Sequence, residues 1–149
     1  MKIRGFLNRS YEPPAPFIKV LLTSKSLGIH NFLDLHIDTG ASATIILDKD
    51  MRYLRLSVAS LRKAARNIGG IGGLIDTYLI DDAVMMFKTE EGMLHEERLS
   101  LLVGVHRLER LAEEERRVIM RLPSLLGRDI LRKFKFSYDE RFDEILMES

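Results

Sequence analysis

The residues with the clearest chemical potential lie in the stretch LHIDTGASATIIL, which runs from Leu35 to Leu47. A short apolar run ends at Asp38, and Thr39 and Gly40 follow directly. Because Gly40 allows a tight turn and a close backbone approach, we expect the Asp38 carboxylate in a partly desolvated place near backbone donors. Such an aspartate can cap a turn, which is its ordinary role, or act as a general acid or base.

Several other kinds of chemistry find no support in the sequence. The chain has no cysteine, which excludes disulfides, thiolate metal ligands and a cysteine nucleophile. Its four histidines lack the HExxH or HxH spacing of metal sites, and no G-x-S-x-G motif of a serine hydrolase is present. The histidines are His30, His36, His95 and His106. We therefore expect no metal and no cofactor.

The composition is that of a globular domain. The 149 residues fit a single domain spanning 1–149, with 46% hydrophobic and 30% charged residues. The net charge of +1 gives no field that would attract nucleic acid. No apolar run approaches the roughly 20 residues that a membrane-spanning helix needs. The start of the chain also lacks a signal-peptide core, so we expect a cytoplasmic protein with no membrane partner.

Strands are predicted on both sides of Asp38. Residues 17–24 and 31–38 form a predicted hairpin, and in the second strand Leu33, Leu35 and Ile37 alternate with polar residues, a pattern typical of a half-buried strand. Further strands are predicted over residues 1–9, 43–47, 75–89 and 96–105, and a closing hairpin over 134–147. The chain is therefore predicted to be mainly β.

Three helices are predicted between these strands. Residues 57–67 combine a plausible Ser57 N-cap with good helix formers. A highly charged segment at about 106–121 carries an apolar stripe and ends before Pro123. A short helix is expected after Gly127.

Three motifs follow one another in an order typical of one family. IDTGAS (37–42) resembles the active-site signature of aspartic proteases. NIGGIGGLI (67–75) resembles the flap of retroviral proteases, and LLGRDIL (125–131) resembles a segment near their C-terminal end. The match spans residues 17–146, so the chain resembles a retropepsin-like, single-lobe aspartic protease. This resemblance implies a closed β-barrel of the acid protease fold with a short C-terminal helix, to which the charged helix at about 106–121 is an insertion.

The resemblance implies an endopeptidase that works as a homodimer on peptide or protein substrates. In this family a water attacks the peptide carbonyl between two carboxyl groups that share a proton. The chain holds only one D-T-G and is too short for two lobes, so the second carboxylate must be the Asp38 of another copy related by a two-fold axis. The alternative is a retropepsin-like dimerisation or peptide-binding module with weak or no catalysis.

The resemblance also assigns supporting roles. Asp38 is the catalytic residue, and Thr39, Gly40 and Ala41 support it in the catalytic loop. Thr39 matches the threonine whose hydroxyl reaches the backbone of the partner subunit, and Gly40 matches a glycine whose carbonyl holds substrate. The flap residues that hold substrate are Gly69, Gly70, Ile71, Gly72 and Gly73.

Two positions near GRD lead to more specific hypotheses. We expect a hydrogen bond between Asp129 and Thr44 that connects the final helix, which begins after Gly127, to the active-site loop. The arginine of this segment often pairs with an acid two residues after the glycine of the triplet. Ser42 occupies that place here, so the ion pair of Arg128 is expected to be lost or rerouted.

Overall fold

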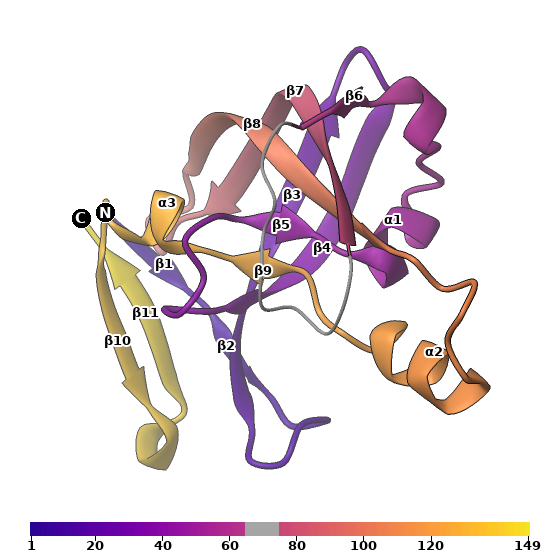
Figure 1. The fold of residues 1–149 in the computed structure, drawn as a ribbon. Coiled ribbons are helices and arrows are strands. Elements are labelled where there is room, and N and C mark those ends of the chain that lie inside the picture. The colour runs from indigo at the N-terminus through magenta and orange to yellow at the C-terminus, as the bar shows by residue number, and fades with distance from the viewer. Residues whose placement is uncertain (65–74) are drawn as a thin grey trace.

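The computed structural model describes residues 1–64 and 75–149. Within these ranges, eight strands form one sheet in the order β2-β3-β4-β9-β5-β8-β7-β6, and β3 also pairs with β7. This extra pairing closes the sheet on itself and makes a barrel (Figure 1). The strands are β2 (Phe6–Asn8), β3 (Ala15–Ser24), β4 (Ile29–Ile37), β5 (Ile45–Ile46), β6 (Arg62–Lys63), β7 (Ile75–Lys88), β8 (Leu94–His106) and β9 (Leu125–Leu126).

A smaller antiparallel sheet brings the two ends of the chain together. Its order is β1 (Lys2–Arg4), β11 (Glu144–Glu148) and β10 (Lys135–Asp139). The N and C termini lie side by side at one side of the barrel, as Figure 1 shows. The helices are short: α1 (Asp48–Tyr53), α2 (Glu113–Ile119), α3 (Arg128–Leu131) and the 3₁₀ turns η1 (Val58–Ser60) and η2 (Glu140–Phe142). Among the described residues, no helix has the length and apolar character to cross a membrane.

The barrel interior is packed with the apolar residues that the period-two pattern predicted. Leu33, Leu35 and Ile37 of β4 are buried, while Asp34 is exposed and His36 is half-buried. Burying each leucine or isoleucine side chain stabilises the fold by roughly 1.5–3 kcal/mol. The mainly β fold class is therefore confirmed, as is the predicted hairpin β3–β4. The strands predicted over 75–89 and 96–105 are also present and pair as a second long hairpin, β7–β8.

The helix predicted over residues 57–67 is wrong where the structure describes it. Val58–Ser60 is a single 3₁₀ turn, and Arg62–Lys63 extends as β6 along β7. The Arg62 guanidinium donates to the Asp81 carboxylate at 2.8 and 3.1 Å across this pair. Strand pairing thus overrides the helix propensity of the segment.

The charged helix is shorter than the predicted 106–121. His106 is the last residue of β8, and α2 occupies only Glu113–Ile119. Of its predicted apolar stripe, Ile119 is 5% exposed but Val118 is 60% exposed. The strand predicted over 43–47 is also shorter, since only Ile45–Ile46 pairs as β5.

Candidate active site

Asp38 lies just beyond the end of β4, where the barrel strand leads into a turn. Its backbone N–H donates to the Leu126 carbonyl at 3.0 Å, which extends the parallel pairing of β4 with β9. Its side-chain Oδ1 accepts the N–H of Gly40 at 2.8 Å, and its carbonyl accepts the N–H of Ala41 at 3.2 Å. The carboxylate is half-buried. The Asp38 side chain therefore caps its own turn through Oδ1. Oδ2 takes no part in the bond with Gly40, so it can still face a reactant.

The segment after β9 packs directly against this turn. A Cβ atom on Gly127 would lie 2.4 Å from the Ala43 carbonyl carbon and 2.6 Å from its oxygen, so a side chain cannot fit there without moving the backbone. The backbone N–H of Arg128 donates to the Ala41 carbonyl at 2.8 Å. Glycine at position 127 thus permits the close approach that fixes the 41–43 segment.

The hydrogen bond predicted between Thr44 and Asp129 is present. Thr44 Oγ1 donates to Asp129 Oδ1 at 2.7 Å, and Thr44 N–H lies 3.0 Å from both carboxylate oxygens. Thr44 Oγ1 also accepts the N–H of Gly127 at 3.0 Å. A single buried threonine therefore connects the active-site loop to both β9 and α3.

Arg128 has been rerouted rather than lost. Its Nη1 donates to the backbone carbonyl of Thr39 at 2.7 Å. This contact holds the peptide unit between Thr39 and Gly40. Thr39 and Gly40 are themselves exposed, so their side of the loop is open to another molecule.

A small apolar pocket lies beside β4 and was not foreseen from the sequence. It has a volume of about 250 Å³ and is lined by Tyr11, Ala15, His36, Leu47, Leu122, Pro123 and Leu125. Burial lowers the pKa of His36, and the nearby Asp38 carboxylate opposes this shift. The strand pattern could have indicated that His36 lies close to Asp38. The two residues are two positions apart in an extended segment, so their side chains face the same side.

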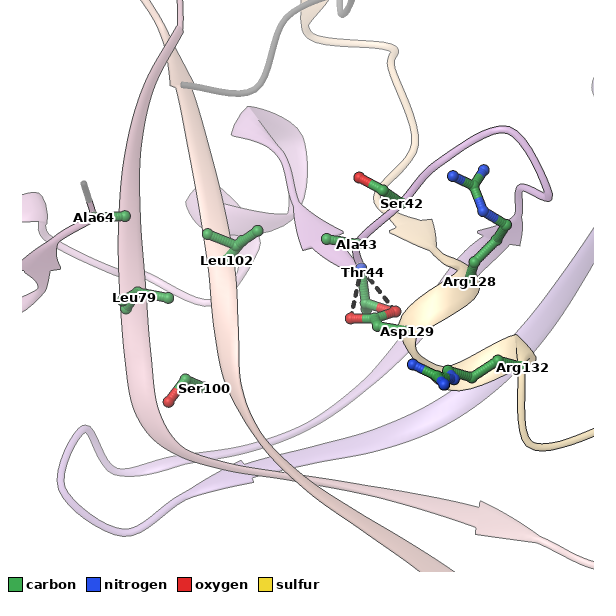
Figure 2. Close-up of a pocket in the computed structure, with 10 residues that line it drawn as sticks. All are labelled: Ser42, Ala43, Thr44, Ala64, Leu79, Ser100, Leu102, Arg128, Asp129 and Arg132. Atoms are coloured by element: carbon green, nitrogen blue, oxygen red, sulfur yellow. Dashed lines mark hydrogen bonds between the residues drawn. The ribbon is translucent and has the colours of Figure 1, made fainter. Parts of the chain in front are cut away.

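A larger cavity of about 680 Å³ adjoins the other side of the loop. Figure 2 shows Ala64, Leu79 and Leu102 on one wall and the Thr44–Asp129 pair with the α3 arginines opposite. Its full lining is Ser42, Ala43, Thr44, Ala64, Leu79, Ser100, Leu102, Arg128, Asp129 and Arg132.

Helix α1 supplies a second set of polar contacts that the sequence did not reveal. Asp50 Oδ2 accepts from Ser124 Oγ at 2.6 Å, and Ser124 Oγ accepts the Leu47 N–H at 3.0 Å. The buried Asp48 carboxylate contacts His106 Nδ1 and accepts the His106 N–H at 3.0 Å. Two carboxylates of α1 thereby hold both ends of the segment that carries α2.

The remaining predicted site residues are not placed. Gly69, Gly70, Ile71, Gly72 and Gly73 lie outside the described residues. In the part of the chain that is described, no group of three His, Asp or Glu side chains could hold a metal ion.

Comparisons with known proteins agree with this geometry at the level of the fold. A retropepsin-like aspartic protease from Rickettsia conorii has a similar structure, with a TM-score of 0.56 and 18% identity over 99% of this chain and 90% of that one. EIAV protease in complex with the inhibitor HBY-793 has a TM-score of 0.46 and 21% identity over 80% of this chain and 86% of that one. The retroviral protease-like domain of Ddi1 from Leishmania major has a TM-score of 0.46 and 12% identity over 89% of this chain and 94% of that one.

The chain therefore has the retropepsin-like fold, and the predicted resemblance is confirmed. No protein-family model matches the sequence, and no curated protein does.

Proposed function

We propose that this chain is an aspartic endopeptidase whose active site forms between two copies. The observation that carries the proposal is the Asp38 turn. In a retropepsin-like fold, a half-buried carboxylate ends a barrel strand, and hydrogen bonds from β9 and α3 fix the loop around it. Holding a catalytic group on a rigid element in this way lowers the cost of reaching the reactive geometry.

The reaction needs a second carboxyl group because one carboxylate cannot both take and give a proton at the same moment. In a homodimer, the Asp38 side chains of the two copies would face each other across the two-fold axis. Two carboxyl groups a few ångströms apart cannot both ionise easily, so they share one proton, as is established for aspartic proteases. The split pKa values belong to the pair.

The bond changes then follow from this shared proton. The ionised Asp38 removes a proton from water, and the water oxygen bonds to the peptide carbonyl carbon. The other Asp38 donates its proton to the carbonyl oxygen, giving a tetrahedral diol. When the C–N bond breaks, the leaving nitrogen takes a proton from the carboxyl group that gained one from water, and a diol proton returns to the other carboxylate. Both copies end in their starting state.

The residues around Asp38 fit an extended peptide substrate. The pocket of Tyr11, His36 and Leu125 would take an apolar side chain next to the scissile bond. The open edge of the loop at Thr39 and Gly40 would face the partner copy and the substrate backbone. The proposal keeps residues 69–73, which lie outside the described ranges, as the predicted substrate-binding flap.

The decisive experiment compares cleavage of a denatured protein and of a peptide library at mildly acidic pH by the wild type and by Asp38→Asn, each with and without pepstatin. We expect cleavage by the wild type, loss of it in the variant and inhibition by pepstatin. Asp34→Asn is the matched control, since Asp34 lies on the same strand but is exposed and forms an ion pair with Lys19 at 3.2 Å. Equal cleavage by wild type and Asp38→Asn would refute the proposal. Peptide binding without cleavage by either would indicate a binding module.

A further inference from the structure

The larger cavity beside the active-site loop contains two guanidinium groups, on Arg128 and Arg132. Both are exposed, and they lie four residues apart on and just after α3. Within residues 1–64 and 75–149, neither forms an ion pair with a carboxylate, and the side chain of Arg128 donates a hydrogen bond to the neutral carbonyl of Thr39. The cavity thus holds positive charge that the described chain does not neutralise by direct pairing.

Asp129, the one acid among the described lining residues, is already engaged by neutral donors. The Asp129 carboxylate accepts the N–H and hydroxyl of Thr44 and the N–H of Ile130 at 2.7 to 3.0 Å. These bonds hold it on the loop side, and Figure 2 shows it between Thr44 and α3. The described lining residues, with two arginines and one aspartate, carry a formal charge of +1.

The two arginines point in different directions. In Figure 2, Arg128 extends toward the loop that carries Ser42, whereas Arg132 extends below Asp129 toward the wall of Leu79 and Ser100. Guanidinium groups bind carboxylates with strong, directed hydrogen bonds. The hydroxyl groups of Ser42 and Ser100 add further donors, and the apolar wall suits the methylene groups of a glutamate side chain.

The cavity is also linked to the proposed active site through the chain. Ser42 and Ala43 line it and directly follow the loop 38–41, along which a substrate would lie. We infer that this cavity is a subsite that binds an acidic side chain of the peptide substrate, with Arg132 as the principal cation and Arg128 as the second. The inference rests on the proposed function and adds a preference for glutamate or aspartate a few residues from the scissile bond. In a symmetric dimer the preference applies on both sides of that bond.

A matched set of fluorogenic peptides tests this preference. Each peptide carries Glu, Gln or Lys at one position near a cleavable bond, and kcat/KM is measured for the full chain. We expect Glu to exceed Gln by about tenfold at one position on each side, as a charge-assisted hydrogen bond predicts, and Lys to fall below Gln. Arg132→Glu should reverse the order so that Lys is preferred, and Arg132→Gln should make Glu and Gln nearly equal.

Two further variants make the result specific to the cavity. Ser42→Asp places a carboxylate on the wall shared with Arg128 and should reduce the Glu preference. Arg52→Glu changes an exposed arginine in the last turn of α1, outside the cavity, and should leave the preference unchanged. Equal rates for Glu and Gln at every position, or a Glu preference that survives Arg132→Glu, would overturn the inference.

A binding measurement separates failure of the subsite from failure of catalysis. Fluorescence anisotropy of labelled Glu and Gln peptides is measured with Asp38→Asn, which keeps the cavity but lacks the proposed catalytic carboxylate. Tighter binding of the Glu peptide supports the subsite even if the wild type cleaves nothing, an outcome that would refute only the proposed protease. Equal affinities, or no binding of either peptide, would overturn the subsite.

Discussion

Thr44 Oγ1 donates to Asp129 at 2.7 Å and accepts from the Gly127 N–H at 3.0 Å, so one buried hydroxyl joins the Asp38 loop to the start of α3. Thr44 is 1% exposed, its bond with Gly127 is buried, and its bond with Asp129 is partly buried. Removing a partner from buried polar groups costs more than the bond itself contributes, because the remaining groups stay desolvated. The precision of the Asp38 loop should therefore depend on this one side chain.

Thr44→Val should destabilise the fold and reduce proposed catalysis together. Valine keeps the volume but leaves the Gly127 N–H without its acceptor and Asp129 without the hydroxyl, which should lower the unfolding free energy by about 1–3 kcal/mol. Urea denaturation measures this change, and kcat/KM measures the effect on the loop. Thr23→Val in β3 is the control, because no hydrogen bond of its hydroxyl occurs among the described residues. Equal effects of the two substitutions would contradict the role of Thr44.

Gly127→Ala should be more damaging than glycine-to-alanine changes elsewhere. The new Cβ would lie 2.4 Å from the Ala43 carbonyl carbon, so the backbone must move and the Asp38 loop with it. Overpacking of this kind costs about 1–3 kcal/mol or more. Gly92→Ala is the comparison, because Gly92 has a φ of +83° but nothing within 4 Å, and its cost of about 1–2 kcal/mol is conformational alone. Activity unchanged in Gly127→Ala but lowered in Gly92→Ala would contradict this account.

The sequence predicted those parts of the site whose cause is local. The alternation of Leu33, Leu35 and Ile37 defined β4, and Gly127 marked the start of the short helix α3. The Thr44–Asp129 bond could also be anticipated, because the family resemblance pairs these two positions.

The features that the sequence did not predict depend on residues that are distant in the chain. Helix α1 has only six residues and no apolar periodicity, and its acids are buried because His106 and Ser124, 58 and 74 residues away, supply their donors. Burial of a carboxylate is possible only with such partners, and a single sequence does not reveal them. The helix predicted at residues 62–63 is wrong for a related reason, because pairing with strand β7 determines the structure of this segment.

Asp82 should contribute stability that disappears in acid. Hydrogen bonds from Ser24 and Ser26 lower the pKa of its carboxyl from 3.8 to about 2. Between these values the unfolded chain binds more protons than the folded one, so this contribution is complete above 3.8 and is lost as the pH falls toward 2. Asp82→Asn should lower the Tm at about pH 6, and the difference from wild type should narrow below the unfolded pKa.

Ser26→Ala provides the intermediate case for Asp82. It removes the hydroxyl donor at 2.8 Å but keeps the carboxylate and the backbone donor at 2.9 Å. Its Tm at about pH 6 should fall between those of wild type and Asp82→Asn. A gap between wild type and Asp82→Asn that stays constant down to pH 2 would show that the carboxylate does not titrate as described.

A mixing experiment tests whether two Asp38 side chains form one active site. If activity needs an Asp38 from each copy, a dimer of wild type and Asp38→Asn is inactive, because the asparagine amide can neither take nor share the proton. Adding an equal amount of Asp38→Asn to a fixed amount of wild type, with time to exchange subunits, should then reduce activity to about half, and a threefold excess to about a quarter, as random pairing requires. The double variant Asp38→Asn, Thr44→Val should inhibit the wild type less than Asp38→Asn does if the loop held by Thr44 also positions the contact between subunits. Activity that is independent of added Asp38→Asn, in a sample that light scattering shows to be exchanging dimers, would mean that each copy works with its own catalytic groups.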